Sequence, residues 1–318
     1  MQARKILSLD GGGIRGIVTC LWLAGVEASL LKHGKPGLLK SFDLMAGSST
    51  GALIACALGL GMSPEAAAEL YRVHRHEIFP GIAERLWSRL ARLPMQGPSA
   101  PKYDPQGMEN VLKKVFGDTP FGQLQLPTLV TSYDTISRKP VVFKSFDPRY
   151  ADLPVWEVCR ASSAAPTYFP AHAMTVDGHP CSMIDGGVVA NNPTACAIAE
   201  ALRKDAQVDN SRDLVVLSVG SGERNRPIPL KSAQEWGALE WAVPIIDVLF
   251  DGNTDSVDYI AQQLVGDGYF RLQTELLIGL DDIDDTSSTN IAALEIMAKQ
   301  YLARAATAQM LKALVARL

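Results

Sequence analysis

Short apolar runs that end close to glycine constrain the fold most strongly. Residues 5–9, 42–46 and 214–219 are mostly apolar, and a glycine follows soon after each run. Runs of this kind are typical of strands buried on both faces of a sheet. Helical apolar patterns follow the first two, in residues 14–31 and in 52–61, where Gly61 stops the helix. This alternation predicts an α/β fold with three layers, α/β/α, whose central sheet is mostly parallel and flanked by helices.

The length of the chain allows one large core. The 318 residues are 47% apolar, and no repeat or linker-like stretch divides them. We therefore expect a single domain over residues 1–318, in which residues 291–318 form one long amphipathic helix.

Composition argues against several classes of protein. The net charge of -4 gives no basic face, so we expect no nucleic-acid partner. Five scattered cysteines without a C-x-x-C pair suit a reducing compartment. The sequence shows no secretory signal, no apolar run approaching the ~18 residues of a membrane span, and no set of metal ligands. These features predict a soluble, cytoplasmic protein that needs no metal or other cofactor.

A candidate nucleophile lies where the second apolar run ends. Residues 47–51, GSSTG, match G-x-S-x-G, with Ser49 at the centre. A serine on a tight strand-to-helix turn has its hydroxyl exposed above the sheet, and the flanking glycines avoid clashes with the neighbouring strand and helix. The amide at the start of the helix points toward developing negative charge. The context of strand, turn and helix favours Ser49 as a nucleophile over a loop without chemistry.

The base that would activate Ser49 is harder to identify. Asp134 followed by His172 or His179 would preserve the order of an α/β-hydrolase triad. Both histidines, however, resemble ordinary polar loop residues. Asp185 ends an apolar stretch and precedes two glycines, which allow another chain segment to come close. A Ser–Asp dyad, in which the carboxylate accepts the hydroxyl proton directly, is therefore the favoured interpretation.

The first glycine-rich turn allows two interpretations. Gly11, Gly13 and Gly16 satisfy the G-x-G-x-x-G spacing of a dinucleotide-binding loop. That site also needs a second strand and an acid about 20 residues further on, and this chain has neither there. The glycine amides at the head of a helix are then better suited to hold an oxyanion. Asp10 is expected to brace the loop.

Three motifs in this order resemble the patatin-like phospholipases: DGGGIRG at residues 10–16, GSSTG at 47–51 and DGGVVANNP at 185–193. RASSAAPTYFP (160–170) and LSVGSG (217–222) resemble the same family. The resemblance implies a patatin-like fold, with a catalytic core over about residues 5–222 and a helical C-terminal part over about 223–318. It also implies Ser49 as nucleophile, Asp185 as general base, and an oxyanion hole at Gly11, Gly12 and Gly13 with Arg15 adjoining.

The activity that this resemblance implies is hydrolysis of lipid acyl esters, of the phospholipase A or lysophospholipase type. A soluble carboxylesterase or thioesterase with the same dyad is an alternative. So is an effector phospholipase of bacterial antiphage defence, activated by a cyclic nucleotide. A nucleotide-binding module that uses the glycine loop is the alternative outside the enzymes.

Two further stretches bear on lipid contact. Residues 82–93 predict a basic amphipathic helix, with Arg85, Arg89 and Arg92 on one face and Trp87 nearby. Such a helix is able to lie on an anionic bilayer, although an ordinary surface helix is the commoner case. Residues 236–250 form an apolar stretch that is expected either to wall or cover an acyl pocket or to belong to the core.

Overall fold

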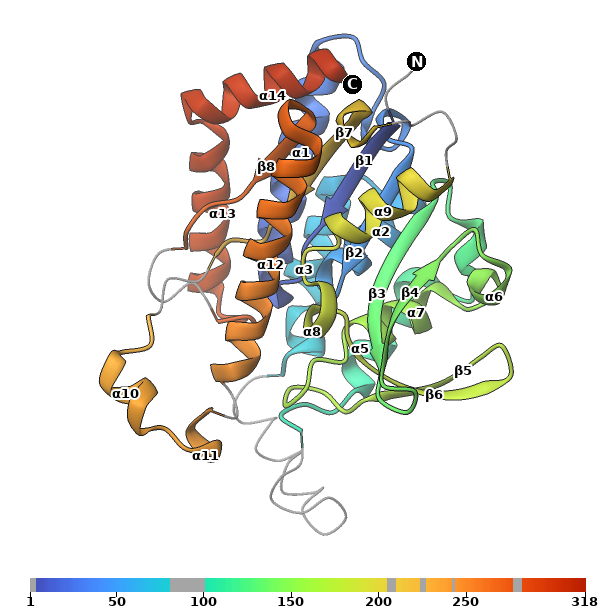
Figure 1. Ribbon diagram of the computed structural model, residues 1–318, viewed down its shortest axis with the longest axis vertical. Coiled ribbons are helices and arrows are strands. Elements are labelled where there is room, and N and C mark those ends of the chain that lie inside the picture. The colour runs from blue at the N-terminus through green and yellow to red at the C-terminus, as the bar shows by residue number, and fades with distance from the viewer. Residues whose placement is uncertain (1–3, 81–100, 205–209, 224–226, 242–243, 277–281) are drawn as a thin grey trace.

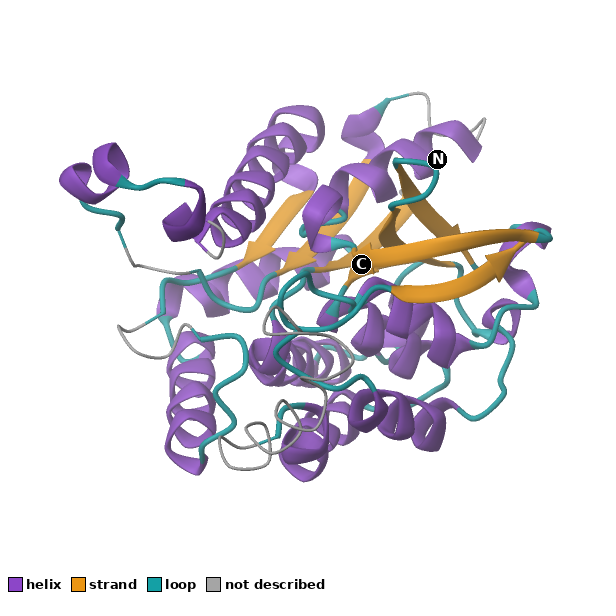
Figure 2. Ribbon diagram, turned by 90° about the horizontal axis from the view of Figure 1, so that it is seen from below, coloured by secondary structure: helices purple, strands orange, loops and turns teal. Residues whose placement is uncertain are grey.

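The computed structural model describes residues 4–80, 101–204, 210–223, 227–241, 244–276 and 282–318 (Figure 1). A central sheet has helices on both of its faces (Figure 2). The expected basic helix at residues 82–93 lies outside the described residues.

The sheet has eight strands in the order β5-β6-β3-β2-β1-β7-β8, with β4 paired to β3. Its parallel part contains β1 (Arg4–Leu9), β2 (Leu44–Ser48), β3 (Thr128–Asp134), β7 (Leu214–Val219) and β8 (Tyr269–Leu272). Its antiparallel additions are β4 (Lys139–Lys144), β5 (His172–Val176) and β6 (His179–Asp185). The predicted mostly parallel sheet is confirmed.

Alternate side chains of the strands pack into two separate cores, which accounts for the three layers. From β1, Leu7 and Leu9 face one core and Ile6 faces the other. The larger core is covered by α1 (Gly16–Lys32), α2 (Thr50–Gly59), α3 (Pro64–Ile78), α5 (Gln106–Phe116), α7 (Val155–Ser162), α13 (Ser288–Leu302) and α14 (Ala305–Arg317). The smaller core is covered by α9 (Thr194–Lys204) and α12 (Pro244–Val265).

Shorter helices connect these elements. They are α6 (Pro148–Ala151), α8 (Gly187–Ala190), α10 (Leu230–Glu235) and α11 (Ala238–Trp241).

Helix α1 is long and apolar enough to cross a membrane, judged by length and composition. The stretch Gly13–Lys32 has a mean hydropathy of 1.5. Most of its apolar side chains, however, are buried against the sheet and the helices beside it, and Ile17, Val18, Trp22 and Leu23 are fully covered. The protein core therefore accounts for the hydrophobicity of α1.

The prediction of one helix over residues 291–318 is wrong, because two helices occupy this stretch. Helix α13 ends at Leu302, and α14 begins at Ala305 after an extended backbone at Arg304, with φ of -67° and ψ of 139°. The guanidinium of Arg304 lies 5.2 Å from the centre of the Tyr301 ring and donates to Thr274 Oγ1 at 3.3 Å. The bend turns α14 so that Leu311 and Leu314 are buried in the larger core.

Candidate active site

Ser49 occupies the turn between β2 and α2, in a backbone conformation that only a few side chains adopt. Its φ is 51° and its ψ is -121°. The Ser49 N–H donates to Ser162 Oγ at 2.8 Å, and the Ser162 hydroxyl donates to the Thr131 carbonyl at 2.7 Å. This relay anchors the turn to the neighbouring strand β3, so the unfavourable φ is maintained by buried hydrogen bonds.

The two glycines that frame Ser49 are there for steric reasons, as the sequence predicts. A Cβ on Gly47 would lie 2.4 Å from the Gly51 carbonyl oxygen, at the start of α2. A Cβ on Gly51 would lie 2.2 Å from the carbonyl oxygen of Leu9, at the end of β1. Strand and helix approach this closely only because both positions lack a side chain.

Register along β3 brings Asp185 to Ser49. Strand β2 pairs with the first half of β3, up to Ser48 opposite Thr131. Strand β6 pairs with the second half, where Asp185 lies opposite Ser132. Because β4 pairs along the whole of this stretch, it occupies the other edge of β3, and β2 and β6 must share one edge. Their carboxyl ends therefore meet head to head, and Ser49 Oγ donates to Asp185 Oδ2 at 2.8 Å.

The Asp185 carboxyl group is buried, with 1% of the residue exposed. Loss of hydration raises its pKa to about 7, although hydrogen bonds from the Gly187 amide and the Ser49 hydroxyl favour the charged form. A carboxylate with this pKa is a stronger proton acceptor than an ordinary aspartate, and the ionised form that accepts the proton predominates above neutral pH.

None of the five histidines, all of which are described, makes a hydrogen bond with Ser49 or Asp185. His172 opens β5 with Nε2 at 3.4 Å from Glu157 Oε1, and His179 Nδ1 contacts the Asp177 carbonyl at 2.8 Å. Both histidines therefore begin strands, and their assignment to loops is wrong.

The other candidates from the sequence are also engaged elsewhere. His74 is buried and pairs with Glu77 Oε1 at 2.5 Å. Asp134 accepts backbone hydrogen bonds from Ile136, Ser137 and Ser182. The structure therefore does not bring together the alternative Asp134–histidine pairs.

The glycine loop follows β1 and faces the Ser49 turn. The N–H of Gly11 donates to the Asn191 carbonyl at 3.0 Å, so this amide is already engaged. Among the described hydrogen bonds, none uses the N–H of Gly12 or Gly13. Gly13 has a φ of +60°, and a Cβ there would lie 2.2 Å from the Ile283 carbonyl oxygen. Of the three predicted oxyanion donors, Gly12 and Gly13 therefore have available amides.

Charged side chains brace this loop. Arg15 Nε donates to the Gly12 carbonyl and Nη1 to the Gly222 carbonyl, both at 3.2 Å. Asp10 Oδ2 accepts from Arg271 Nη2 at 2.6 Å, which agrees with the structural role expected for Asp10. The contacts from Arg15 to Gly222 and from Asp10 to Arg271 connect the loop to segments more than 200 residues away in the sequence.

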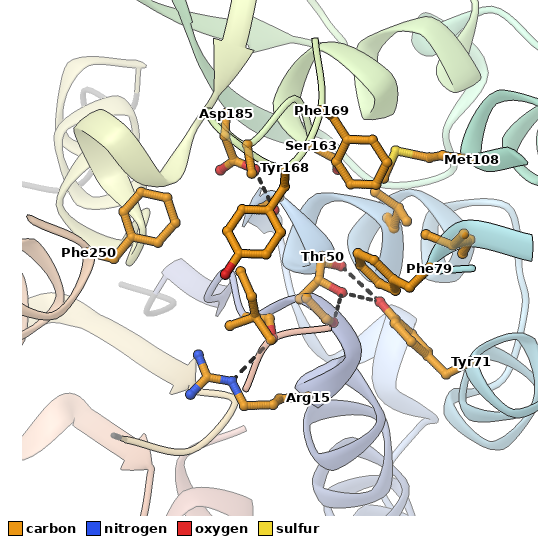
Figure 3. Close-up of a pocket in the computed structure, with 17 residues that line it drawn as sticks. Arg15, Thr50, Tyr71, Phe79, Met108, Ser163, Tyr168, Phe169, Asp185 and Phe250 are labelled. Carbon is orange, nitrogen blue, oxygen red and sulfur yellow. Dashed lines mark hydrogen bonds between the residues drawn. The ribbon is translucent and has the colours of Figure 1, made fainter. Parts of the chain in front are cut away.

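A hydroxyl pair joins the loop to the Ser49 turn, and only one of its two members lies within a sequence motif. Thr50 Oγ1 donates to the Gly13 carbonyl at 2.9 Å and also contacts the hydroxyl of Tyr71 (Figure 3). The position of Thr50 directly after Ser49 was visible in the sequence. Tyr71 was not identifiable, because it comes from the middle of α3 and no local motif marks it.

An apolar cavity opens beside these groups. Figure 3 shows Phe250 on one side of it and Phe79, Phe169 and Met108 on the other. Ser49, Asp185, Gly12 and Gly13 line the same cavity. Phe250 comes from the stretch at residues 236–250, so the expectation that this stretch walls a pocket is confirmed for Phe250. Among the described residues, no group of three or more histidine, cysteine, aspartate or glutamate side chains could hold a metal ion.

Comparison with known proteins gives the family. The family model described as "Patatin-like phospholipase" matches residues 7–198. Patatin-like protein 2 of Oryza sativa subsp. indica is 30% identical over 90% of this chain and 80% of its own length. Patatin-like protein 3 of Arabidopsis thaliana is 31% identical over 92% of this chain and 79% of its own length.

Among solved structures, VipD from Legionella pneumophila has a TM-score of 0.46 and 13% identity, covering 98% of this chain and 67% of its own. This likeness is too distant to carry a functional conclusion. The family-model match and the two plant relatives are sufficient by themselves, and the chain belongs to the patatin-like phospholipase family.

Proposed function

We propose that this protein is a lipid acyl hydrolase in which Ser49 attacks the ester carbonyl and Asp185 is the general base. The observation that carries the proposal is the 2.8 Å hydrogen bond from Ser49 Oγ to Asp185 Oδ2, at the wall of an apolar cavity. A nucleophile needs its base within hydrogen-bond reach, and an acyl chain needs an apolar surface beside the reacting carbonyl.

In the first step, Ser49 Oγ forms a bond to the acyl carbon while its proton passes to Asp185 Oδ2. The carbonyl oxygen becomes an oxyanion. The amides of Gly12 and Gly13 are proposed to donate to it, because no described contact engages them. Gly11 supports the loop through its bond to Asn191, and Arg15 positions the loop through its bonds to the carbonyls of Gly12 and Gly222.

The tetrahedral intermediate then collapses and its ester C–O bond breaks. The leaving alcohol takes the proton from Asp185, and an acyl group remains on Ser49. Water attacks this acyl-enzyme and gives a proton to Asp185, and the proton returns to Ser49 when the fatty acid leaves. Every step uses side chains and backbone amides of this chain, and the proton balance closes over one cycle.

Phospholipids or lysophospholipids are the proposed substrates. Family membership supports this class, and so does the apolar lining of the cavity by Phe79, Met108, Phe169 and Phe250. A soluble carboxylesterase or thioesterase would use the same chemistry. The two differ in their response to long acyl chains and to lipid vesicles.

The test compares two adjacent serines. Ser49→Ala should abolish both lipid hydrolysis and covalent labelling by a fluorophosphonate. Ser48→Ala is the matched control, because the Ser48 side chain is fully buried within β2. This variant should leave labelling intact. Turnover of Ser49→Ala at the wild-type rate would refute the proposal.

A substrate panel separates the alternatives. Phosphatidylcholine, lysophosphatidylcholine, short soluble esters and thioesters should be compared with and without cyclic dinucleotides. Activity on soluble esters alone would indicate a carboxylesterase or thioesterase. Lipid hydrolysis only with a cyclic dinucleotide would indicate an activated effector. Tight binding of NAD or ATP without labelling would indicate a nucleotide-binding module.

A further inference from the structure

A second apolar cavity lies between α2, α3 and α5, behind the one that contains Ser49. Aliphatic and aromatic side chains line it throughout, apart from the hydroxyl of Tyr71. Among these side chains, Leu53 and Ala57 come from α2, Tyr71 and Ile78 from α3, and Val115 and Phe116 from α5. No charged side chain is among them, so the cavity suits a hydrocarbon rather than a polar head group.

The two cavities are adjacent, because they share wall residues. Leu53, Tyr71 and Ile78 line both of them. Along α2, Thr50 and Leu53 face the first cavity, and Leu53 and Ala57 face the second. The spacing of three and four residues places these side chains on one face of the helix. One helix face therefore leads from the nucleophile to the second cavity.

The Tyr71 hydroxyl does not make the wall that the two cavities share polar. It is bound to Thr50, through Oγ1 and through the backbone carbonyl at 3.4 Å, and it is buried. Burial raises the pKa of this phenol, so the hydroxyl remains neutral. The part of Tyr71 that remains available to both cavities is its aromatic ring.

We propose that the second cavity holds the distal part of the substrate acyl chain, and that α5 limits the longest chain accepted. The inference rests on the proposed hydrolysis at Ser49. From Ser49 to Ala57 the helical rise covers about 12 Å, so a short acyl group ends in the first cavity and only a long one reaches the second. Val115 and Phe116 belong to the wall on α5, and Leu70 belongs to the wall on α3.

The first test narrows the second cavity from two different helices. Val115→Phe and Leu70→Trp each add bulk at a half-buried position, where the fold tolerates it better than in the core. For each variant, kcat/KM is measured with p-nitrophenyl butyrate and p-nitrophenyl palmitate. The ratio of palmitate to butyrate should fall at least about tenfold, since a hydrophobic pocket discriminates by that much per methylene. Lys114→Phe is the matched control, because Lys114 is exposed on α5 and does not line the cavity.

The second test does not depend on turnover. Palmitate binding is measured by calorimetry with Ser49→Ala and with Ser49→Ala carrying Val115→Phe or Leu70→Trp. The chains that carry Val115→Phe or Leu70→Trp, called plugged variants because the added side chain fills the second cavity, should bind palmitate at least about tenfold more weakly than Ser49→Ala. The reason is the same discrimination per methylene.

The outcomes separate this inference from the proposed function. Unchanged palmitate binding and an unchanged ester ratio in both plugged variants would place the acyl chain elsewhere and overturn the inference. A wild-type chain that hydrolyses no ester would instead refute the proposed function. Even in that case, weaker palmitate binding in the plugged variants would support the second cavity as a fatty-acyl site.

Discussion

The backbone N–H of Gly187 donates to Asp185 Oδ1 at 2.7 Å, which leaves Oδ2 to face Ser49. The carboxyl group is thus oriented by the chain two residues further on. Gly186 makes this turn possible, because a Cβ there would lie 2.3 Å from the Thr131 carbonyl oxygen.

Asp185→Asn should preserve this arrangement and remove the proton acceptor. We expect kcat to fall by at least about 10²-fold, the usual scale for a positioned base. His172→Ala, measured with the same soluble ester, should change kcat far less. Equal losses in the two variants would favour a histidine as the base.

The pH dependence of activity should follow the Asp185 carboxyl group, whose pKa burial raises to about 7. Only the ionised form accepts the proton of Ser49. In the free enzyme, kcat/KM for a short soluble ester should therefore rise as pH increases toward about 7 and level off above it. A flat profile between about pH 5 and pH 9 would disagree with this assignment.

The free energy of unfolding should fall over the same pH range in which activity rises. The pKa of Asp185 rises from its ordinary 3.8 to about 7 on folding, so the native state binds the proton more tightly. The resulting stabilisation is complete below about pH 4 and is lost as pH rises through about 7. Asp185→Asn has no carboxyl group at this position, so its stability does not include this loss as pH rises. Its Tm relative to the wild type should increase from pH 4 to pH 8, and a constant difference would contradict the raised pKa.

Thr50→Val removes the hydroxyl that joins the nucleophile turn to the Gly13 carbonyl. Loss of one buried hydrogen bond is worth about 1 kcal/mol, so we expect kcat to fall roughly fivefold to tenfold with little change in KM. Thr50→Ser keeps the hydroxyl and should restore most of kcat. A parallel loss in Thr50→Ser would mean that the threonine methyl group, not the hydrogen bond, matters.

Gly13→Ala and Gly34→Ala form a matched pair. Both glycines have a positive φ, of +60° and +70°, so both substitutions carry a similar backbone cost of about 1 kcal/mol. The space around Gly34 is open, whereas a Cβ on Gly13 would collide with the Ile283 backbone. Esterase activity should be lost in Gly13→Ala and retained in Gly34→Ala. Normal activity in Gly13→Ala would mean that activity does not require the close approach of the glycine loop to the Ile283 backbone.

The sequence predicted the features that depend on neighbours along the chain. The glycine frame of Ser49 follows from local backbone chemistry. The buried strands also followed, because apolar periodicity records burial directly.

Features set by packing between distant segments could not be predicted in this way. Strand β8 was not predicted, since its four residues carry no pattern until β7 lies beside them. The bend at Arg304 has no glycine or proline to mark it. The engaged amide of Gly11 depends on Asn191, which only the folded chain brings near.

The glycine loop depends on residues that follow it by more than 250 positions in the chain. Ile14 N–H donates to the Ile283 carbonyl at 2.9 Å, and Asp10 is paired with Arg271. During synthesis, the Ser49 turn and the first strands emerge long before either partner exists. The nascent chain consequently carries the Ser49 turn before the glycine loop has the contacts that hold it in its folded form.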